Sequence, residues 1–340
     1  MYSHLRFFPM LLQVSRVLCR LGVTVIAPAV LWIAPVTAYA QGNYPNKPVR
    51  LIVAYAAGGV ADVIARIVAT PLSAELGQNF VIDNRPGAGG AIGTQQCANA
   101  TPDGYTLCMG SQSSIILNPM LFKEARYEPV RSFTPITLIA YAPNVLVVSP
   151  KLGVRSADDL MKWLKANPGA AWGTSGVGTS NHLTAIYLNK AFGLRIEHVP
   201  YKGGILAVQD VIAGQIPMAM DQISSSIAHV RRGALVAVLQ SGVTRSAHLP
   251  DVSTFAETVF PKFRFDSFQA LLGPAGMPPE VVKRLSASIT RILASPDVAK
   301  KFDAIGVVPV GNPPAEFSKQ IREQVPIFRE LMDMSGLKPE

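Results

Sequence analysis

Short apolar runs alternate with glycine-containing turns and helix-forming stretches along most of this chain, and this alternation restricts the fold more than any other feature. Residues 49–55, VRLIVAY, form an apolar run, and residues 61–76 carry apolar side chains at helical spacing. Further strand-like runs follow at 79–84 and 104–110, with another glycine turn and helical stretch between them. Strand, helix, strand, helix, strand at this spacing predicts a doubly wound α/β sheet whose strands run parallel.

A second series of the same kind follows a long apolar run at 144–150. With 340 residues, the chain is better divided into two lobes than packed around one core. From about Phe255 the pattern returns to the first lobe, so we expect two crossings between lobes, near 140–146 and 250–258. The expected division is a signal peptide at 1–40, lobe 1 at 44–143 plus 257–340, and lobe 2 at 144–256.

The N-terminal segment has the composition of a secretory signal. It carries Arg6, Arg16 and Arg20 without an acidic residue, then an apolar run, and it ends VTAYAQG. Ala38 and Ala40 occupy the −3 and −1 positions of a signal-peptidase site, which predicts cleavage after Ala40 and export to the periplasm. An uncleaved membrane anchor is one alternative, although prolines interrupt an apolar run at the short end of a membrane span. A lipoprotein at Cys19 is another, although Arg16 and Leu18 before it do not make a lipobox.

The remaining composition argues against several function classes. Removing the three N-terminal arginines reduces the formal net charge from +9 to +6, and the charges left are interspersed. This pattern gives no support to nucleic-acid binding, and it is compatible with a small acidic ligand. No spacing of histidine, cysteine or acidic residues predicts a metal site, and we expect no cofactor. Cys97 and Cys108 are either two buried thiols or, after export, a disulfide.

Several motifs resemble those of one receptor family. In order along the chain they include YPNKPVRLIV, AGGVADVIAR, NRPGAGGAIG, TPDGYTL, GTSGVGTSNHL and HVPYKGG. Their order and spacing resemble the solute-binding receptors of tripartite tricarboxylate transporters, also called Bug receptors, over nearly the whole chain after the signal. The resemblance implies a two-lobed periplasmic binding protein of type II-like fold that closes on a carboxylate. It also implies delivery of that ligand to a membrane permease with one large and one small subunit.

The first expected contact with the ligand lies where the strand at 49–55 turns into the following helix. A helix N-terminus presents unpaired amides and a partial positive charge, and glycine lets a ligand approach the backbone closely. The candidates are Tyr55, Gly58, Gly59, Val60, Ala61 and Asp62. Related receptors commonly have a serine, threonine or proline after the paired glycines. Val60 and Ala61 here favour a less polar or aromatic acid over a highly charged tricarboxylate.

The second expected contact is the turn GTSGVGTSN in the other lobe. Hydroxyl and amide groups stand there beside a helix start, so a dicarboxylate gripped at one end by each lobe would favour closure. The candidates are Ser175, Gly176, Thr179, Ser180 and Asn181. Ordinary strand-to-helix turns also use such glycines, so both turns have a purely structural alternative.

Three further side chains stand at expected strand ends. Tyr201 could contact the ligand, Asp221 could bind an amino group, orient a water or cap a helix, and Gln269 could present its amide from the returning strand.

We therefore expect a non-enzymatic α/β receptor with two mainly parallel sheets flanked by helices. A periplasmic hydrolase is a weak alternative, because GTSGV lacks the final glycine of GxSxG around Ser175. A ligand sensor that contacts a histidine kinase is another alternative, and the same cleft would serve it.

Overall fold

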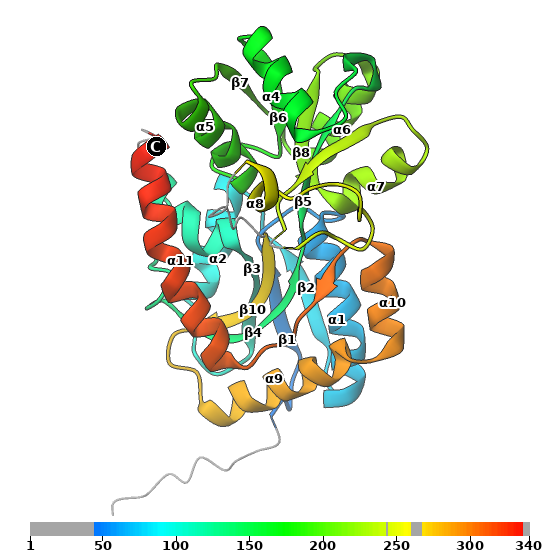
Figure 1. Ribbon diagram of the computed structural model, residues 1–340. Coiled ribbons are helices and arrows are strands. Elements are labelled where there is room, and N and C mark those ends of the chain that lie inside the picture. Colours follow the sequence, from blue (N-terminus) through cyan, green and yellow to red (C-terminus); the bar gives the residue numbers. More distant parts are fainter. Residues whose placement is uncertain (1–43, 243, 260–266, 336–340) are drawn as a thin grey trace, which may run out of the picture. The chain divides into compact units, whose positions relative to one another are not determined.

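The computed structural model describes residues 44–242, 244–259 and 267–335, and these form two sheets with helices on both faces of each (Figure 1). The expected signal peptide at 1–40 lies outside the described residues. In the described part, no helix has the length and apolar character needed to cross a membrane.

The first sheet has six strands in the order β11-β4-β10-β3-β1-β2. Their bounds are β1 Val49–Val53, β2 Phe80–Asn84, β3 Thr106–Ser111, β4 Phe133–Tyr141, β10 Phe268–Pro274 and β11 Val308–Pro309. The second sheet has five strands in the order β7-β6-β8-β5-β9. Their bounds are β5 Asn144–Val148, β6 Ala170–Thr174, β7 Ile196–Pro200, β8 Met218–Gln222 and β9 Val236–Gln240.

Helices cover both faces of each sheet. Their bounds are α1 Val60–Leu76, α2 Ala91–Ala98, α3 Asn118–Leu121, α4 Ala157–Ala166, α5 Ser180–Phe192, α6 Gly204–Ala213, α7 Ile223–Arg231, α8 Phe255–Thr258, α9 Pro279–Leu293, α10 Pro296–Ala304 and α11 Pro314–Ser335. Short helical turns precede or follow some of them, at Ala88–Gly90, Ser113–Leu117 and Pro150–Leu152. The two-sheet α/β fold expected from the sequence is confirmed.

Both sheets are mixed, which corrects the expectation that they are mainly parallel. In the first sheet, β1 pairs in parallel with β2 and β3, whereas β10 runs antiparallel to β3 and β4. In the second, β5 runs antiparallel to β8 and β9, whereas β6 pairs in parallel with β7 and β8. The strands β5 and β10, which follow the crossings, begin at the end of the sheet where most of their neighbours finish, so they run antiparallel to those neighbours. Strand-helix alternation does not reveal that reversal.

The direct connection between the sheets makes their strand ends face the same region. β4 of the first sheet continues into β5 of the second through Ala142 and Pro143. The strands β1, β2 and β3 run in the direction of β4, and β6 to β9 run opposite to β5. The carboxyl ends of all seven strands therefore point toward this crossing. In α/β sheets, ligands bind outside the carboxyl ends of strands.

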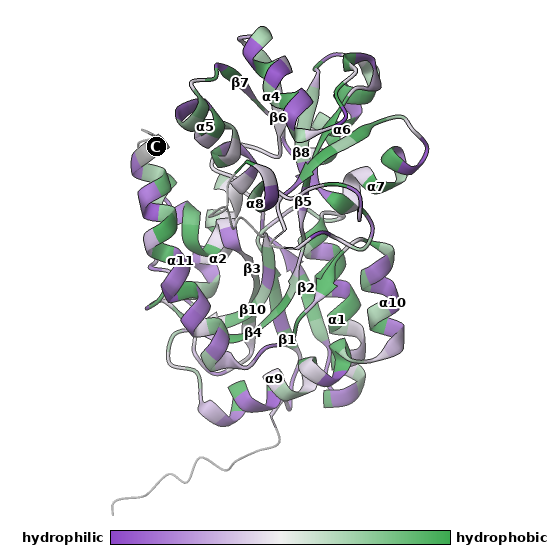
Figure 2. Ribbon diagram, in the orientation of Figure 1, coloured by the Kyte–Doolittle hydropathy of each residue, from purple (hydrophilic) through white to green (hydrophobic). Residues whose placement is uncertain are grey.

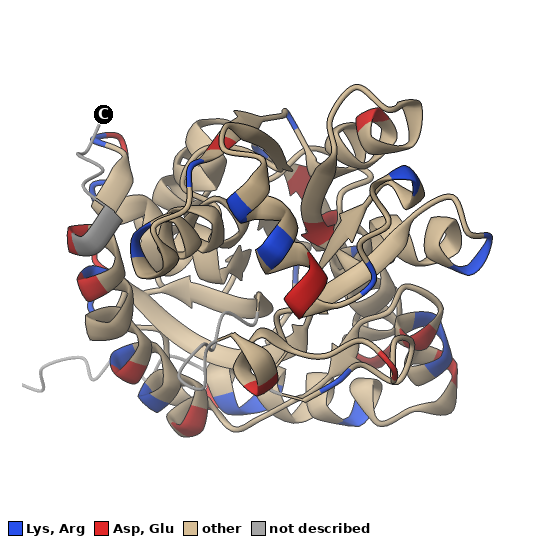
Figure 3. Cartoon of the chain, turned by 45° about the horizontal axis from the view of Figure 1, so that its top comes forward, with Lys and Arg blue, Asp and Glu red and all other residues tan. Residues whose placement is uncertain are grey.

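Apolar side chains form the core on both faces of each sheet, and the strands are the most hydrophobic parts of the ribbon (Figure 2). One cluster of buried side chains extends from the first sheet to the second and includes Leu272 and Trp172. Helix α11 belongs to the same cluster through Phe328 and packs against α5. The C-terminal helix thus connects the part of the chain around the first sheet to a helix of the second. Blue and red segments alternate along it (Figure 3).

The two cysteines form a disulfide, the second of the two alternatives that the sequence left open. Cys97 on α2 and Cys108 on β3 are bonded, with their Cα atoms 6.0 Å apart. Both side chains are buried. The bond ties the helix after the second glycine turn to the strand beneath it.

Candidate ligand site

The first glycine turn has the conformation expected of a ligand-binding helix start. Gly58 has a φ of +82°, which favours glycine, and Gly59 is the N-cap of α1 with extended backbone angles. The amides of Val60 and Ala61 then lie in the first turn of the helix, ahead of its first intrahelical donors. Ala61 is buried and Val60 is partly exposed. These two amides remain the candidates for ligand contact at this end.

Asp62 is part of the scaffold of that turn. Its Oδ2 accepts a hydrogen bond from the Gly58 amide at 2.9 Å, so the protein itself satisfies one of the donors that we expected to hold ligand. Arg66 donates to both carboxylate oxygens, at 3.0 Å each, and Asn84 Nδ2 donates to Oδ1 at 3.0 Å. Burial raises the pKa of Asp62, but these hydrogen bonds outweigh it and hold the pKa below the ordinary value.

Tyr55 precedes the turn at Gly58 and Gly59, and its ring contacts the turn before α2 at Gly90. Its hydroxyl is hydrogen-bonded to Ser111 Oγ at 2.6 Å, and burial raises the pKa of its phenol. A Cβ added at Gly90 would lie 3.2 Å from Tyr55 Cζ, so the ring packs against the backbone just before α2. Sequence reasoning did not single out Ser111, whose only signal was its position at the end of β3.

The start of α5 combines a side-chain cap with open amides. Thr179 is the N-cap; its Oγ1 accepts from the His182 amide at 3.3 Å and donates to the Gly176 carbonyl at 2.9 Å. The hydroxyl of Thr179 is therefore engaged within the turn. The amides of Ser180 and Asn181 occupy the first positions of the helix, where they have no intrahelical acceptor.

Two polar side chains at this helix start are almost fully buried. Ser180 Oγ accepts a hydrogen bond from Asn144 Nδ2 at 3.5 Å, which links α5 to the first residue of β5. Asn181 is 3% exposed, and within the described residues its Oδ1 has no hydrogen-bond partner. Asn144 was not predicted, although it is the polar residue directly after the crossing.

The same turn touches the part of the chain around the first sheet. Gly178 has a φ of +72°, and a Cβ built there would lie 2.3 Å from Leu121 Cδ1 on α3. An added Cβ would therefore require the end of the Leu121 side chain or the turn itself to shift, and the positive φ of Gly178 favours glycine independently. The contact joins the loop before α5 to a helix that follows β3.

Two histidines lie behind the α5 turn. His182 Nδ1 accepts from the Gly178 amide at 3.2 Å, and the ring stacks on His198 with centroids 3.7 Å apart. His198 Nε2 is hydrogen-bonded to Thr174 Oγ1 at 2.6 Å. Burial lowers the pKa of His182 to about 3 and that of His198 to about 4. Both rings are thus neutral supports of the turn, and the described contacts of His182 do not include Ser175.

Tyr201 directs its phenol toward α6. Its hydroxyl donates to Asp210 Oδ2 at 2.6 Å, and its amide donates to the Thr174 carbonyl at 3.0 Å. Burial, together with Asp210, raises the pKa of the Tyr201 phenol to about 12. The ring remains partly exposed beside Gly176, whose added Cβ would lie 3.6 Å from the Tyr201 carbonyl oxygen.

Asp221 occupies the penultimate position of β8 and is 8% exposed. Ser225 Oγ donates to its Oδ2 at 2.6 Å. Its carboxyl group lies against the start of α6, because a Cβ added at Gly204 would lie 1.9 Å from Asp221 Cγ. Burial raises the pKa of Asp221 to about 6, against the opposing effect of Ser225 and the Gln222 backbone. The cap of α7 is Gln222, so Asp221 is not that N-cap.

Gln269 lies near the start of β10, opposite Ser111 of β3 and Ala140 of β4. It is 2% exposed, and within the described chain its Oε1 has no hydrogen-bond partner. The same holds for Gln112 Oε1, one residue beyond β3. Buried amide oxygens of this kind are commonly paired with water or ligand.

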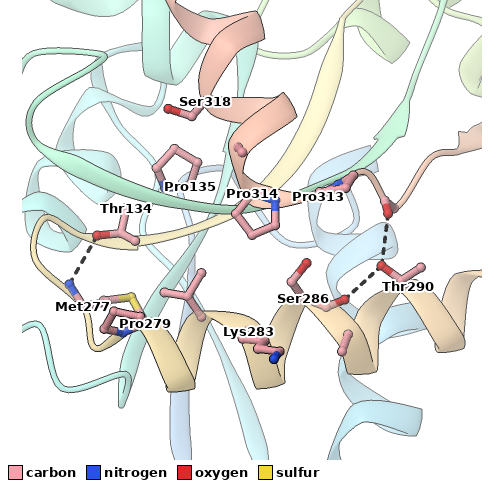
Figure 4. A pocket seen from close by; sticks show the side chains of 14 residues that line it. Thr134, Pro135, Met277, Pro279, Lys283, Ser286, Thr290, Pro313, Pro314 and Ser318 are labelled. Carbon is pink, nitrogen blue, oxygen red and sulfur yellow. Dashed lines mark hydrogen bonds between the residues drawn. The ribbon is translucent and has the colours of Figure 1, made fainter.

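A metal centre and a cavity are two other kinds of site to consider among the described residues. The described residues contain no group of histidine, cysteine or acidic side chains suited to a metal ion. A cavity of about 620 Å³ lies elsewhere, lined by Thr134, Met277, Lys283 and Pro314 among others (Figure 4). It opens where β4 begins and β10 ends, which is the end of the first sheet opposite to the turns before α1 and α2. None of the predicted site residues lines it.

Comparisons with known proteins identify related receptors and similar folds. A family model described as tripartite tricarboxylate transporter family receptor matches residues 64–337. Protein BugT of Bordetella pertussis is 32% identical, with 96% of this chain and 99% of that protein covered. A solved periplasmic transporter is 39% identical, with a TM-score of 0.80 and coverage of 87% of this chain and 99% of its own.

Two similar solved structures contain dicarboxylates. One is a Rhodopseudomonas palustris protein with adipate, 29% identical, with a TM-score of 0.80 and coverage of 87% of this chain and all of its own. The other is MatC from the same organism with malate, 26% identical, with a TM-score of 0.76 and coverage of 85% of this chain and all of its own.

Proposed function

Because the chain belongs to the tripartite tricarboxylate transporter family of receptors, we propose that it captures a small organic acid and delivers it to a membrane permease of that transporter class. The family and the similar structures are solute-binding proteins, so the chain is a binding protein and not an enzyme. Similar proteins are periplasmic, which supports a binding role in the periplasm for this chain.

The observation that carries the proposal is the pair of helix starts at the facing strand ends. Val60 and Ala61 offer amides at the start of α1, and Ser180 and Asn181 offer them at the start of α5. A carboxylate at either end would accept from these amides and be favoured by the positive end of the helix. Adipate and malate in two similar proteins support a carboxylate of this size.

The sides of the site differ in what they offer beyond amides. Beyond its amides, the start of α1 offers the apolar side chains of Val60 and Ala61. The Asp62 carboxylate is already hydrogen-bonded, because Arg66 donates to both of its oxygens. The α5 end adds the buried amide of Asn181. We therefore propose that α5 holds the more strongly hydrated carboxylate and that α1 faces the less polar end of the ligand.

The proposal is tested by a thermal-melt screen of the mature protein, unfolded and refolded to remove bound ligand. The panel contains mono-, di- and tricarboxylates, aromatic acids, acidic amino acids and the corresponding amides. A ligand present at a hundred times its Kd stabilises by about 2.7 kcal/mol, which raises the melting temperature by a few degrees. Shifts from one class of acids that vanish on amidation support the proposal, and shifts from neutral compounds alone overturn it.

Delivery to a permease is tested in cells. Deleting the receptor should abolish uptake of the acid that the screen identifies, while leaving its ligand-dependent gene expression unchanged. Loss of gene induction with normal uptake would replace the transport role by a sensory one.

A further inference from the structure

Asp221 lies near the carboxyl end of β8, one of the strand ends that point toward the crossing between the sheets. Trp172 of β6 pairs with Met218 of β8 and Gly173 with Ala219, and Asp221 follows two residues after Ala219 on β8. Side chains alternate along a strand, so Asp221 projects to the same face of β8 as Ala219. Gly204 at the start of α6 lies directly against its carboxyl group on that face. The carboxylate thus lies at the carboxyl end of β8, against the start of α6 and two residues before the start of α7.

This carboxylate lacks the partners that a buried charge ordinarily has. Ser225 supplies one hydroxyl donor, and the Gln222 backbone supplies another hydrogen bond. Among the described residues, no lysine, arginine or histidine forms an ion pair with Asp221. A buried carboxylate without a cation or a full set of donors is costly, and such groups gather at functional sites.

Asp62 provides an internal comparison, because it is also almost fully buried beside a helix start. Asp62 receives two hydrogen bonds from Arg66, one from Asn84 and one from Gly58. Its pKa falls below the ordinary value, whereas burial raises that of Asp221. The first carboxylate is therefore satisfied by the protein, and the second has acceptor capacity left.

We infer that the ligand carries a hydrogen-bond donor, a hydroxyl or an ammonium group, next to a carboxylate, and that this donor pairs with Asp221. The inference rests on the proposed function, since it concerns the same site. A ligand with carboxylates alone would bring like charge toward Asp221, whereas a hydroxyl or ammonium group supplies the missing donor.

Two buried amide side chains in the described chain also have an oxygen without a partner, but they do not distinguish a donor-bearing ligand from another. Asn181 Oδ1 and Gln269 Oε1 have no partner among the described residues. An amide can rotate to present its NH₂ group, but a carboxylate has no donor end to offer. Asp221 is therefore the side chain that discriminates between ligands with and without a donor.

The test compares acids of equal length by calorimetric titration of the refolded wild-type protein. The probes form two series of equal chain length. Succinate is compared with malate and aspartate, and adipate with 2-hydroxyadipate and 2-aminoadipate; within each series the acids differ in carrying no donor, a hydroxyl or an ammonium group next to a carboxylate. We expect the best donor-bearing acid to bind roughly tenfold to a hundredfold more tightly than its unsubstituted counterpart, the range for a hydrogen bond to a charged group. Equal or tighter binding of the unsubstituted acids overturns the inference without requiring any variant.

The variants then assign the preference to Asp221. Asp221→Asn should reduce the preference to within about threefold, which is below the contribution of one charged hydrogen bond. Asp251→Asn, an exposed site with the same loss of charge, should retain it. Ser225→Ala removes a competing donor to Asp221 and should retain or increase it. A preference that survives in a folded Asp221→Asn protein refutes the assignment. If no acid binds at all, the proposed function itself fails and the inference with it.

Discussion

Replacing Gly178 by alanine should weaken ligand binding by disturbing the contact between the α5 turn and α3. An added Cβ at Gly178 would lie 2.3 Å from Leu121 Cδ1, well inside van der Waals contact. An extra methyl group in a well-packed site destabilises that packing by about 1–3 kcal/mol. We expect the turn and α3 to separate in the ligand-free protein, so that this cost falls on the arrangement in which they meet. If ligand binds in that arrangement, Kd rises by roughly 5-fold to 150-fold.

A matched control separates this contact from backbone strain. Gly193 ends the same helix with a φ of +62° and has no atom within 4 Å of an added Cβ. Gly178→Ala and Gly193→Ala each place alanine in the left-handed region, which costs about 1–2 kcal/mol. Both should therefore lower the melting temperature by a similar few degrees, but only Gly178→Ala should raise Kd markedly.

Calorimetric titration with the acid identified by the melt screen measures Kd for each variant. Small-angle scattering with and without that acid shows whether the compaction on binding is reduced in Gly178→Ala. In a Leu121→Ala background, adding Gly178→Ala should change Kd no more than Gly193→Ala does, because the opposing methyl groups are gone. Equal losses of affinity in the two glycine variants, or no relief in the Leu121→Ala background, would refute the role of this contact.

Three further predictions concern stability. Reducing the bond between Cys97 and Cys108 should lower the free energy of unfolding by about 3 kcal/mol, the loop-entropy value for a separation of 11 residues, as measured by denaturant titration with and without reductant. The pKa of folded Asp62 is depressed, so its carboxylate stabilises the fold above the unfolded pKa of about 4, and this stabilisation is lost as pH falls. Asp62→Asn should therefore make the melting temperature fall less steeply below about pH 4. An unchanged dependence of melting temperature on pH contradicts this prediction. Burial lowers the pKa values of His182 and His198 to about 3 and about 4. The unfolded chain therefore binds more protons than the folded protein below about pH 6.5, so the free energy of unfolding should fall between about pH 6.5 and 4. Replacing both histidines by glutamine should reduce this fall, as measured by melting temperatures across that pH range.

Local sequence signals predicted those features that depend on residues near one another in the chain. Gly77 ends α1 in the left-handed conformation, as a glycine after the last apolar position of a helix indicates. Ser156 caps α4 by accepting from the Asp159 amide, as a serine three residues before an aspartate indicates. The glycine-containing turns at 58–59 and 176–178 precede α1 and α5, as expected from glycines between a strand and a helix. Each of these signals lies within one turn of the structure that it predicts.

Features formed between distant segments could not be read in this way. Strand direction depends on where the chain crosses, so the alternation of strands and helices did not reveal that β5 and β10 run antiparallel to their neighbours. The link from Asn144 to Ser180 joins residues 36 apart, and neither residue type identifies the other. The disulfide was undecided for a related reason, since only the pairing of α2 with β3 brings the two sulfur atoms together.

The two buried aspartates show most clearly what a motif can and cannot establish about this site. Both were predicted as ligand contacts because both stand beside a helix start at a strand end. At Asp62 the partner Arg66 lies one helical turn away, a spacing visible in the sequence, and its two hydrogen bonds make the carboxylate a structural cap. At Asp221 no cation occurs at the corresponding spacing, where Ser225 stands instead. Ligand recognition is therefore better sought at the aspartate whose i+4 neighbour is neutral, and this criterion needs only the sequence once the helix start is known.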